Sequence, residues 1–401
     1  MILKETLKKV VQAQRAELEK RDMGVIRDLL PEIDLNLPHA IILSGIRRCG
    51  KSTLLRQLMR KAEKNYYFNF EDSRVSGFDA ADFERLEQVF KDEYGDCQYY
   101  FFDEIQVVGG WEIFVRNLLD RGKKCIITGS NASLLSKELG TKLTGRHLTY
   151  ELFPFSYNEM LKLTSRKESK SSFDDYFNDG GFPEFLKYKK NELLQQLFKD
   201  ILNRDIIVRH KIREAKIVEE IALFLLTNSG KEFSYNNLAK YFKLGSPNSI
   251  ISYVSFFEDS YLIFTIPKFD YSLKKQIINP KKIYGIDVGF SKANSASFSE
   301  DKGRMLENLV FLHLRRKFKN IYYFKENNEC DFLIKEKEKI TAAIQVCFEL
   351  NDENKDREVE GLKEAMRKFK LKKGKIVTLD QEDKIGNISI VPIWKYVGDK
   401  S

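Results

Sequence analysis

The sequence of 401 residues lacks any run of about 18 uncharged apolar residues, the length that a membrane-spanning helix requires. Its first 20 residues also lack the apolar core of a secretory signal peptide, and their hydrophobic residues recur at helical spacing instead. We therefore expect no membrane partner and a cytoplasmic protein.

Cysteine and histidine are scarce. The five cysteines form an odd, scattered set in which no pair has the spacing of a metal-binding motif. Such a set is typical of a reduced cytosolic protein and excludes a disulfide-stapled secreted domain. The four histidines are isolated and predict no site of their own.

The composition, with 42% hydrophobic and 32% charged residues, is that of a soluble globular chain of two or three domains. The net charge of +9 is compatible with a polyanionic partner. Charge alone does not identify such a partner, because many basic proteins never bind nucleic acid.

The clearest motif follows a short apolar strand predicted at residues 40–43. Residues 45–53 read GIRRCGKST, which matches the P-loop pattern G-x-x-x-x-G-K-[ST], and a helical stretch follows. Glycines let the backbone turn tightly, so that successive N–H groups face the phosphates of a bound nucleotide. We predict ATP contacts from Gly45, Ile46, Arg47, Arg48, Cys49, Gly50, Lys51, Ser52 and Thr53.

Residues 98–104, QYYFFDE, form the second half of the predicted site. A continuous apolar run that ends in carboxylates is typical of a central parallel strand. We predict that Lys51 reaches the β- and γ-phosphates and that Ser52 and Asp103 hold Mg²⁺. Glu104 is the predicted catalytic residue that polarises the attacking water.

Two more strands are predicted, at residues 65–70 and 124–131, and the strands alternate with helices. This alternation predicts an α/β fold with a parallel sheet and helices on both faces. The second of these strands ends in Ser130 and Asn131, which are candidates for contacting the γ-phosphate.

By these motifs the chain resembles AAA+ ATP-binding proteins of bacteria and archaea that carry a C-terminal domain of unknown function. The resemblance covers about residues 20–190, through GIRRCGKSTLLRQL, YYFNFEDSR, YYFFDEIQ, ITGSNASLLSKEL, LTGRHLTYELFPFSYNEM and DGGFPEFL. It implies that Asp103 and Glu104 are Walker B residues and that Asn131 or Ser130 is a sensor.

The same resemblance draws attention to Arg146, in the sequence TGR. It implies an arginine finger or γ-phosphate sensor, acting in its own subunit or in a neighbour's. A surface arginine that follows a turn glycine fits the sequence equally well.

The middle of the chain predicts helices at residues 191–208 and 212–227, followed by a helix-turn-helix whose second helix spans 249–259. Two strands, 261–266 and 276–284, with a basic loop between them, then suggest the wing of a winged helix.

The second helix of this region offers serines, an asparagine and acids, which make a poor base-reading face. Packing against protein is therefore the preferred role, and double-stranded DNA is the alternative partner. Its phosphates would be held by Lys274, Lys275, Lys281 and Lys282.

In the last part of the chain, Glu307 on a helix and Asp331 on a strand have the order of the PD-(D/E)XK nuclease core. This resemblance implies a nuclease-like fold with acidic groups for Mg²⁺ and a lysine for developing charge. At the third position, however, Gln345 supplies no charge and Cys347 replaces the lysine. A degenerate scaffold is therefore preferred over a working nuclease.

These features divide the chain into an AAA+ P-loop ATPase domain, a helical lid or linker, a winged-helix-like region and a nuclease-like domain. Their predicted bounds are 1–165, 166–230, 231–290 and 291–401.

The predicted function is a Mg²⁺-dependent ATPase whose hydrolysis switches or drives a C-terminal recognition module, with DNA as a candidate target. The alternatives are an ATP-dependent DNA-processing nuclease and a slowly hydrolysing protein that uses nucleotide to control assembly. No motif identifies a protein partner or a self-association surface.

Overall fold

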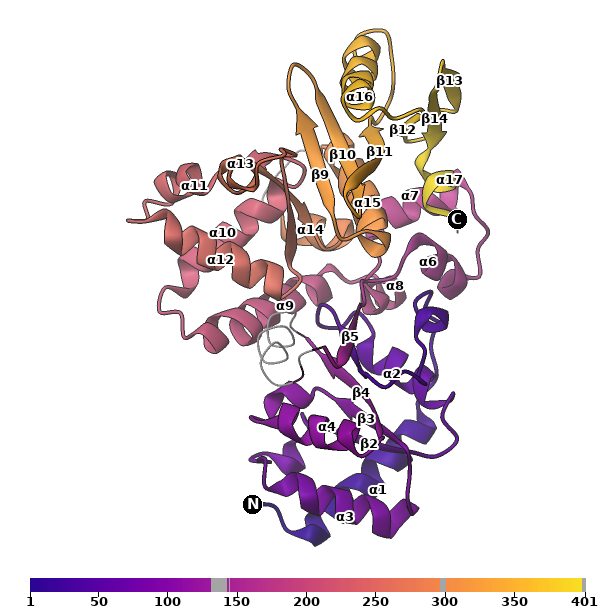
Figure 1. Cartoon of the computed structure of the whole chain (residues 1–401), viewed down its shortest axis with the longest axis vertical. Helices are drawn as coiled ribbons and strands as arrows, with labels where there is room; N and C mark the ends of the chain where they lie inside the picture. The colour runs from indigo at the N-terminus through magenta and orange to yellow at the C-terminus, as the bar shows by residue number, and fades with distance from the viewer. Residues whose placement is uncertain (131–142, 144, 296–300, 399–401) are drawn as a thin grey trace. The chain divides into compact units, whose positions relative to one another are not determined.

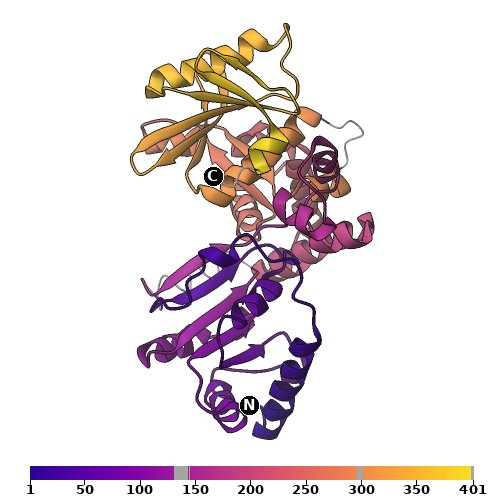
Figure 2. The same ribbon diagram turned by 90° about the vertical axis from the view of Figure 1, so that its right-hand side faces the viewer.

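The computed structural model describes residues 1–130, 143, 145–295 and 301–398. It divides into two compact units, Met1–Phe153, which is built on one sheet, and Pro154–Ser401, which contains two (Figure 1; Figure 2). In the described ranges, no helix is both long enough and apolar enough to cross a membrane.

The first unit is built on a five-stranded sheet in the order β2-β3-β4-β1-β5, in which every pairing is parallel. The predicted parallel sheet is thus confirmed. Its strands are β1 (Ala40–Ser44), β2 (Asn65–Asn69), β3 (Tyr99–Asp103), β4 (Lys124–Gly129) and β5 (His147–Glu151).

Helices cover both faces of this sheet because successive strand residues point to opposite sides. On one face, Tyr66, Phe68, Tyr100 and Phe102 form a core with apolar side chains of three helices. These helices are α1 (Lys4–Lys20), α3 (Asp82–Tyr94) and α4 (Trp111–Asp120). Helix α2 (Lys51–Met59) contacts β1, β3 and β4 outside that core. Three short 3₁₀ turns connect these elements: η1 (Leu30–Glu32), η2 (Ser73–Val75) and η3 (Ile105–Val107).

The edge strand β5 was not predicted as a strand. Its sequence, HLTYE, lacks an apolar run, and its side chains are half-buried or exposed. Backbone pairing with β1, from Ala40 opposite His147 to Ser44 opposite Glu151, holds it in place.

The second unit begins with a helical region. Its elements are α6 (Tyr157–Thr164), α7 (Lys170–Asp179), α8 (Pro183–Tyr188), α9 (Asn191–Asp200), the π-helix η4 (Ile201–Val208) and α10 (Ala215–Thr227). The helix predicted at residues 191–208 is therefore α-helical only in its first half and continues directly as a π-helix.

The next segment forms a three-stranded antiparallel sheet in the order β6-β8-β7. Its elements are β6 (Glu232–Phe233), α11 (Tyr235–Tyr241), α12 (Pro247–Asp259), β7 (Ile263–Pro267), α13 (Leu273–Ile278) and β8 (Lys281–Gly285). The strand predicted from residue 276 is wrong in its first part, because Gln276–Ile278 belongs to helix α13. Asp270 caps the turn before α13 by accepting from the Ser272 amide at 2.8 Å.

The chain ends in a six-stranded mixed sheet, ordered β13-β14-β12-β11-β10-β9, with helix α16 packed against it. The strands are β9 (Ile321–Lys325), β10 (Glu329–Glu336), β11 (Lys339–Val346), β12 (Gly374–Thr378), β13 (Asp383–Ile385) and β14 (Ile388–Pro392). The helices are α14 (Val288–Asn294), α15 (Lys302–Lys317), α16 (Lys355–Phe369) and α17 (Ile393–Gly398). The α/β fold class, with a helical region between two sheet-containing parts, is confirmed.

Candidate functional site

The P-loop connects the end of β1 to the start of α2. Gly45 and Gly50 have φ angles of +154° and +102°, which side chains disfavour, and a Cβ on Gly45 would lie 2.1 Å from the Leu152 carbonyl oxygen. Gly50 is the N-cap of α2, and no side chain in the described structure caps this helix. The first-turn N–H groups are therefore available to the oxygens of a phosphate.

Lys51 is buried at the start of α2. Its Nζ donates to the carbonyl oxygens of Gly45 and Ile46 at 3.0 and 3.1 Å, and lies 4.0 Å from Glu104 Oε1. The structure thus brings the predicted phosphate-binding lysine and the predicted catalytic carboxylate together inside the loop.

Asp103 and Glu104, at the end of β3, are both held by the hydroxyl of Thr128 on β4. Thr128 Oγ1 donates to Asp103 Oδ1 and accepts from the Glu104 amide at 2.9 Å. Tyr67 adds a hydrogen bond to Asp103 at 3.3 Å. Burial raises the pKa of Asp103, and the neighbouring charge of Glu104 raises it further, while hydrogen bonds from Thr128 and Ser52 lower it.

Glu104 has a left-handed backbone conformation, with φ of +54°. Such a conformation costs a non-glycine residue on the order of 1–3 kcal/mol and persists where surrounding contacts enforce it. Here the enforcing contacts are the Thr128 hydroxyl on its amide and Gln106, whose side chain donates to its carboxylate. The acid is thereby held facing Lys51.

The other loop residues have structural contacts. Arg47 forms an ion pair with Glu71 at 3.6 Å, and Arg48 takes a left-handed φ of +61°. Cys49 is fully buried, which raises the pKa of its thiol. Ile46 is buried as well, whereas Ser52 is exposed and Thr53 is half-buried.

Two supporting residues were missed by sequence reasoning. Thr128 was missed although a hydroxyl inside the apolar strand CIITG was a usable signal. Arg27 gave no signal, because it lies outside every motif. Its buried guanidinium donates to the carbonyl oxygens of Cys49 and Phe153 at 2.6 and 2.7 Å, and so connects the P-loop to the segment that follows β5.

The remaining predicted residues of this site lie at the ends of strands. Ser130 is buried directly after β4, whereas Asn131 lies outside the described residues. Arg146 precedes β5 and forms an ion pair with Asp120.

Because β5 runs parallel to β1 with His147 opposite Ala40, Arg146 lies at the amino end of the sheet, whereas the P-loop follows the carboxyl end. The length of β1, about 13 Å at 3.3 Å per residue, separates the two. The structure does not bring Arg146 to the P-loop of its own chain, and its role in a neighbouring subunit stays a prediction.

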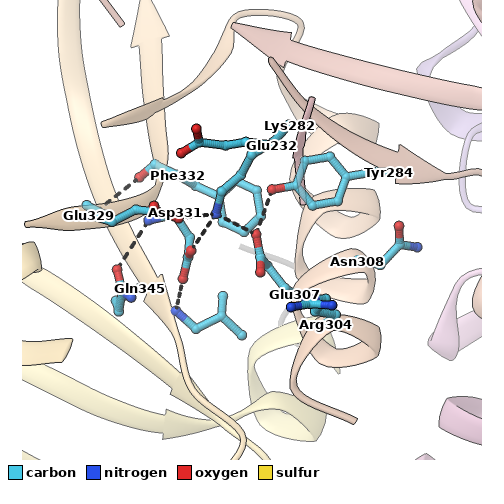
Figure 3. Close-up of polar contacts among 12 residues, drawn as sticks. Glu232, Lys282, Tyr284, Arg304, Glu307, Asn308, Glu329, Asp331, Phe332 and Gln345 are labelled. Atoms are coloured by element: carbon cyan, nitrogen blue, oxygen red, sulfur yellow. Dashed lines mark hydrogen bonds and ion pairs between the residues drawn. The ribbon is translucent and has the colours of Figure 1, made fainter. Parts of the chain in front are cut away.

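A second constellation lies in the second unit, where Glu307 of α15 and Asp331 of β10 come together around Lys282 of β8 (Figure 3). Lys282 Nζ lies 2.9 Å from Glu307 Oε1, 2.9 Å from Asp331 Oδ1 and 2.7 Å from Glu329 Oε1. Lys282 is only 3% exposed, so the prediction that it holds DNA phosphates is wrong.

The electrostatics of this ion cluster follow from its burial. Burial raises the pKa of Glu307 to about 7, and repulsion from Asp331 adds to the shift. Burial acts to lower the pKa of Lys282, but the surrounding charges, Asp331 foremost, raise it well above its ordinary value. Tyr284 donates to Glu307 Oε1 at 2.7 Å.

Gln345 and Cys347 differ in their relation to the ion cluster. Gln345 accepts from the Asp331 amide at 3.2 Å and donates to Glu358 at 2.6 Å, so it packs beside the cluster. The Cys347 thiol instead donates to the Glu349 carbonyl at 3.0 Å. Among the residues that the structure describes, no group of three His, Cys, Asp or Glu side chains is arranged to hold a metal ion.

Comparison with protein families divides the chain into three parts. Residues 38–161 match an AAA domain. Residues 170–300 and 302–396 match two domains of unknown function, DUF8612 and DUF4143. The first match, together with the loop geometry, makes this part of the chain a P-loop NTPase domain.

Similar proteins span most of the chain. An uncharacterized protein of Haemophilus influenzae is 29% identical over 77% of this chain and 82% of its own. Among solved structures, AMPPCP-bound DnaA from Aquifex aeolicus covers 62% of this chain and 88% of its own at 15% identity, and its TM-score of 0.29 supports no argument. The uncharacterized protein MJ1544 of Methanocaldococcus jannaschii is 36% identical over 99% of this chain and 96% of its own. The chain therefore belongs to the family of MJ1544 and carries an AAA-type P-loop domain in its first unit.

Proposed function

We propose that the protein is a Mg²⁺-dependent ATPase that uses hydrolysis to switch or drive its second unit as a recognition module. The observation that carries this proposal is the meeting of Lys51 and Glu104 at 4.0 Å, with Asp103 held beside them by Thr128. Such a set combines a phosphate-binding cation, a metal ligand and an acid positioned for water.

The residues present fit a nucleotide with its metal ion. The uncapped start of α2 provides N–H donors for phosphate, and the exposed Ser52 hydroxyl and Asp103 carboxylate provide the hard oxygen ligands that Mg²⁺ prefers. When bound, the ion neutralises charge on the phosphates. Lys51 would orient the phosphates, and Glu104 would accept a hydrogen bond from the attacking water.

The test is ATP binding and turnover in the full chain and two variants. We expect Lys51→Ala to lose binding, and Glu104→Gln to keep binding while turnover falls about 100-fold or more. Lys64→Ala, which changes an exposed lysine of the same unit, is the matched control. Equal turnover in the wild type and Lys51→Ala would refute the proposal.

A winged-helix-like recognition region is supported by the order α10, β6, α11, α12, β7, α13, β8 and by the pairing of β6 and β7 with β8. Its exposed Lys274 and Lys275, on α13, are the proposed contacts for duplex DNA. Neutralising both should lower the salt dependence of DNA retention by about two counterions. DNA retention that is unchanged by this double substitution would leave packing against protein as the role of this region.

The two alternative functions predict different outcomes for the same preparations. A DNA-processing nuclease requires metal-dependent cleavage that Glu307→Ala abolishes, and the Lys282 contacts of Glu307 give that activity no support. A slow, nucleotide-controlled assembly protein requires ATP binding that changes the oligomeric state while turnover stays near zero. The four-part division of the chain at residues 165, 230 and 290 stays part of the proposal.

A further inference from the structure

Lys282 is fully satisfied by carboxylates. An ammonium group has three N–H donors, and the three acceptors around this one are carboxylate oxygens at 2.7 to 2.9 Å. They come from separate elements, since Glu307 lies on α15 while Glu329 and Asp331 lie on β10. Lys282 itself lies on β8, so one side chain connects the three-stranded sheet to α15 and to the six-stranded sheet (Figure 3).

Without Lys282, the second nearby lysine, Lys325, would contact only one of the three carboxylates in the described ion pairs, Glu329. Lys325, 46% exposed on its side chain, is 3.2 Å from Glu329 and 2.6 Å from Glu232. Lys282 is the cation that contacts Glu307 and Asp331, each at 2.9 Å. Buried carboxylates that lose a contacting cation strongly destabilise a fold.

Carboxylate oxygens converging on one point are also the ligands that hard divalent cations prefer. The orientation of the Asp331 carboxylate is fixed, because its second oxygen accepts a hydrogen bond from the Val346 amide at 2.9 Å. Tyr284 donates to Glu307 Oε1, the same oxygen that contacts Lys282. The acceptors are thus oriented toward the point that the lysine nitrogen occupies.

We propose that Lys282 is the resident cation of this carboxylate site: its ammonium takes the position of a divalent metal ion and closes the site to metal. The chain then needs no metal here for folding. Removing the ammonium group and its alkyl stem exposes a site for Mn²⁺ or Mg²⁺. This inference is independent of the proposed ATPase activity.

The test measures Mn²⁺ binding to the full chain without nucleotide, by calorimetry and by the thermal unfolding midpoint. Lys282→Ala removes the charge and leaves space, and we expect it to bind one Mn²⁺ at least ten-fold more tightly than the wild type. Its midpoint should rise by several degrees with Mn²⁺. Lys282→Met removes the charge but fills the space, and its midpoint should not respond.

Two further variants identify the site. Lys325→Ala removes the other lysine that contacts Glu329, and we expect it to gain no Mn²⁺ binding. Adding Glu307→Gln to Lys282→Ala should weaken Mn²⁺ binding at least ten-fold, because one charged ligand is lost.

Two outcomes would overturn the proposal. One is a wild-type protein that already binds Mn²⁺ at a single site and loses it in Glu307→Gln. The other is a Lys282→Ala protein that does not respond to Mn²⁺, even at concentrations that would saturate a weak site. Such a protein would neither bind Mn²⁺ nor become more stable, and if it were unfolded, Mn²⁺ would not restore its fold.

Discussion

Lys51 and Lys282 are both buried lysines beside acids, yet their partners differ. Lys51 donates to two neutral carbonyl oxygens, and its nearest carboxylate contact is at 4.0 Å. Lys282 contacts three carboxylates within 2.9 Å. Because an ammonium group interacts more strongly with an anionic oxygen than with a neutral carbonyl oxygen, Lys51 can exchange its carbonyl partners for a phosphate, whereas Lys282 already contacts anionic oxygens. Partner type, and not burial, separates a lysine ready for a ligand from one that serves as an internal counter-ion.

The largest expected effect comes from replacing Lys282, whose ammonium group contacts three carboxylates. Lys282→Met should lower the free energy of unfolding by about 3–5 kcal/mol, because it leaves charged carboxylates buried without their cation. This free energy is measured by denaturant unfolding, with hydrogen exchange as the probe that reports on the second unit. Lys325→Ala should cost less than about 1 kcal/mol, as exposed ion pairs do. Equal costs for the two variants would contradict the comparison.

Lys51→Met should show the reverse pattern. Nucleotide affinity should fall about 100-fold or more, while the nucleotide-free protein should lose less stability than the about 3–5 kcal/mol expected for Lys282→Met, because the acceptors that Lys51 leaves behind are neutral carbonyl oxygens. Titration with a fluorescent ATP analogue and thermal unfolding without nucleotide provide the two values. A nucleotide-free protein as unstable as Lys282→Met would show that the two lysines have the same role.

Thr128 tests whether the acids beside Lys51 depend on their support. We expect Thr128→Val to lower turnover about 10- to 100-fold, since losing hydrogen bonds worth about 1–3 kcal/mol lets Asp103 and Glu104 shift. ATP affinity should change by no more than about three-fold. Thr128→Ser keeps the hydroxyl and should keep most of the turnover, and a serine variant as slow as valine would assign the effect to packing.

The smallest effect concerns the pH dependence of the ion cluster. The pKa of Glu307 is raised to about 7 in the folded protein, against about 4.3 when unfolded. Between these values the folded state binds more protons, so this group's contribution to stability falls as pH rises from about 4.3 to 7 and then levels off. The thermal midpoint of the wild type minus that of Glu307→Gln should decrease by a few degrees over this range. A difference that rises with pH would contradict the assigned burial.

The P-loop, the strand carrying Asp103 and Glu104 and the parallel sheet were predictable, because each is written in consecutive residues. Lys282 was misjudged because Lys281 and Lys282 read as a basic pair, whereas in β8 Lys281 is half-buried and Lys282 is fully buried. Arg27 could not be found, since its acceptors lie 22 and 126 residues away in sequence. Helix α13 was missed because a basic loop with neighbouring apolar residues resembles the start of a strand.

Arg27 also determines where the first unit can be separated from the rest of the chain. It joins the Cys49 carbonyl of the P-loop to that of Phe153, the last residue of the unit, and the Leu152 amide donates to Ser44 at 2.7 Å. A fragment ending at Glu151 would have its complete sheet but would lack the acceptors and donors that shape the loop. The shortest fragment expected to retain a native P-loop therefore extends through Phe153.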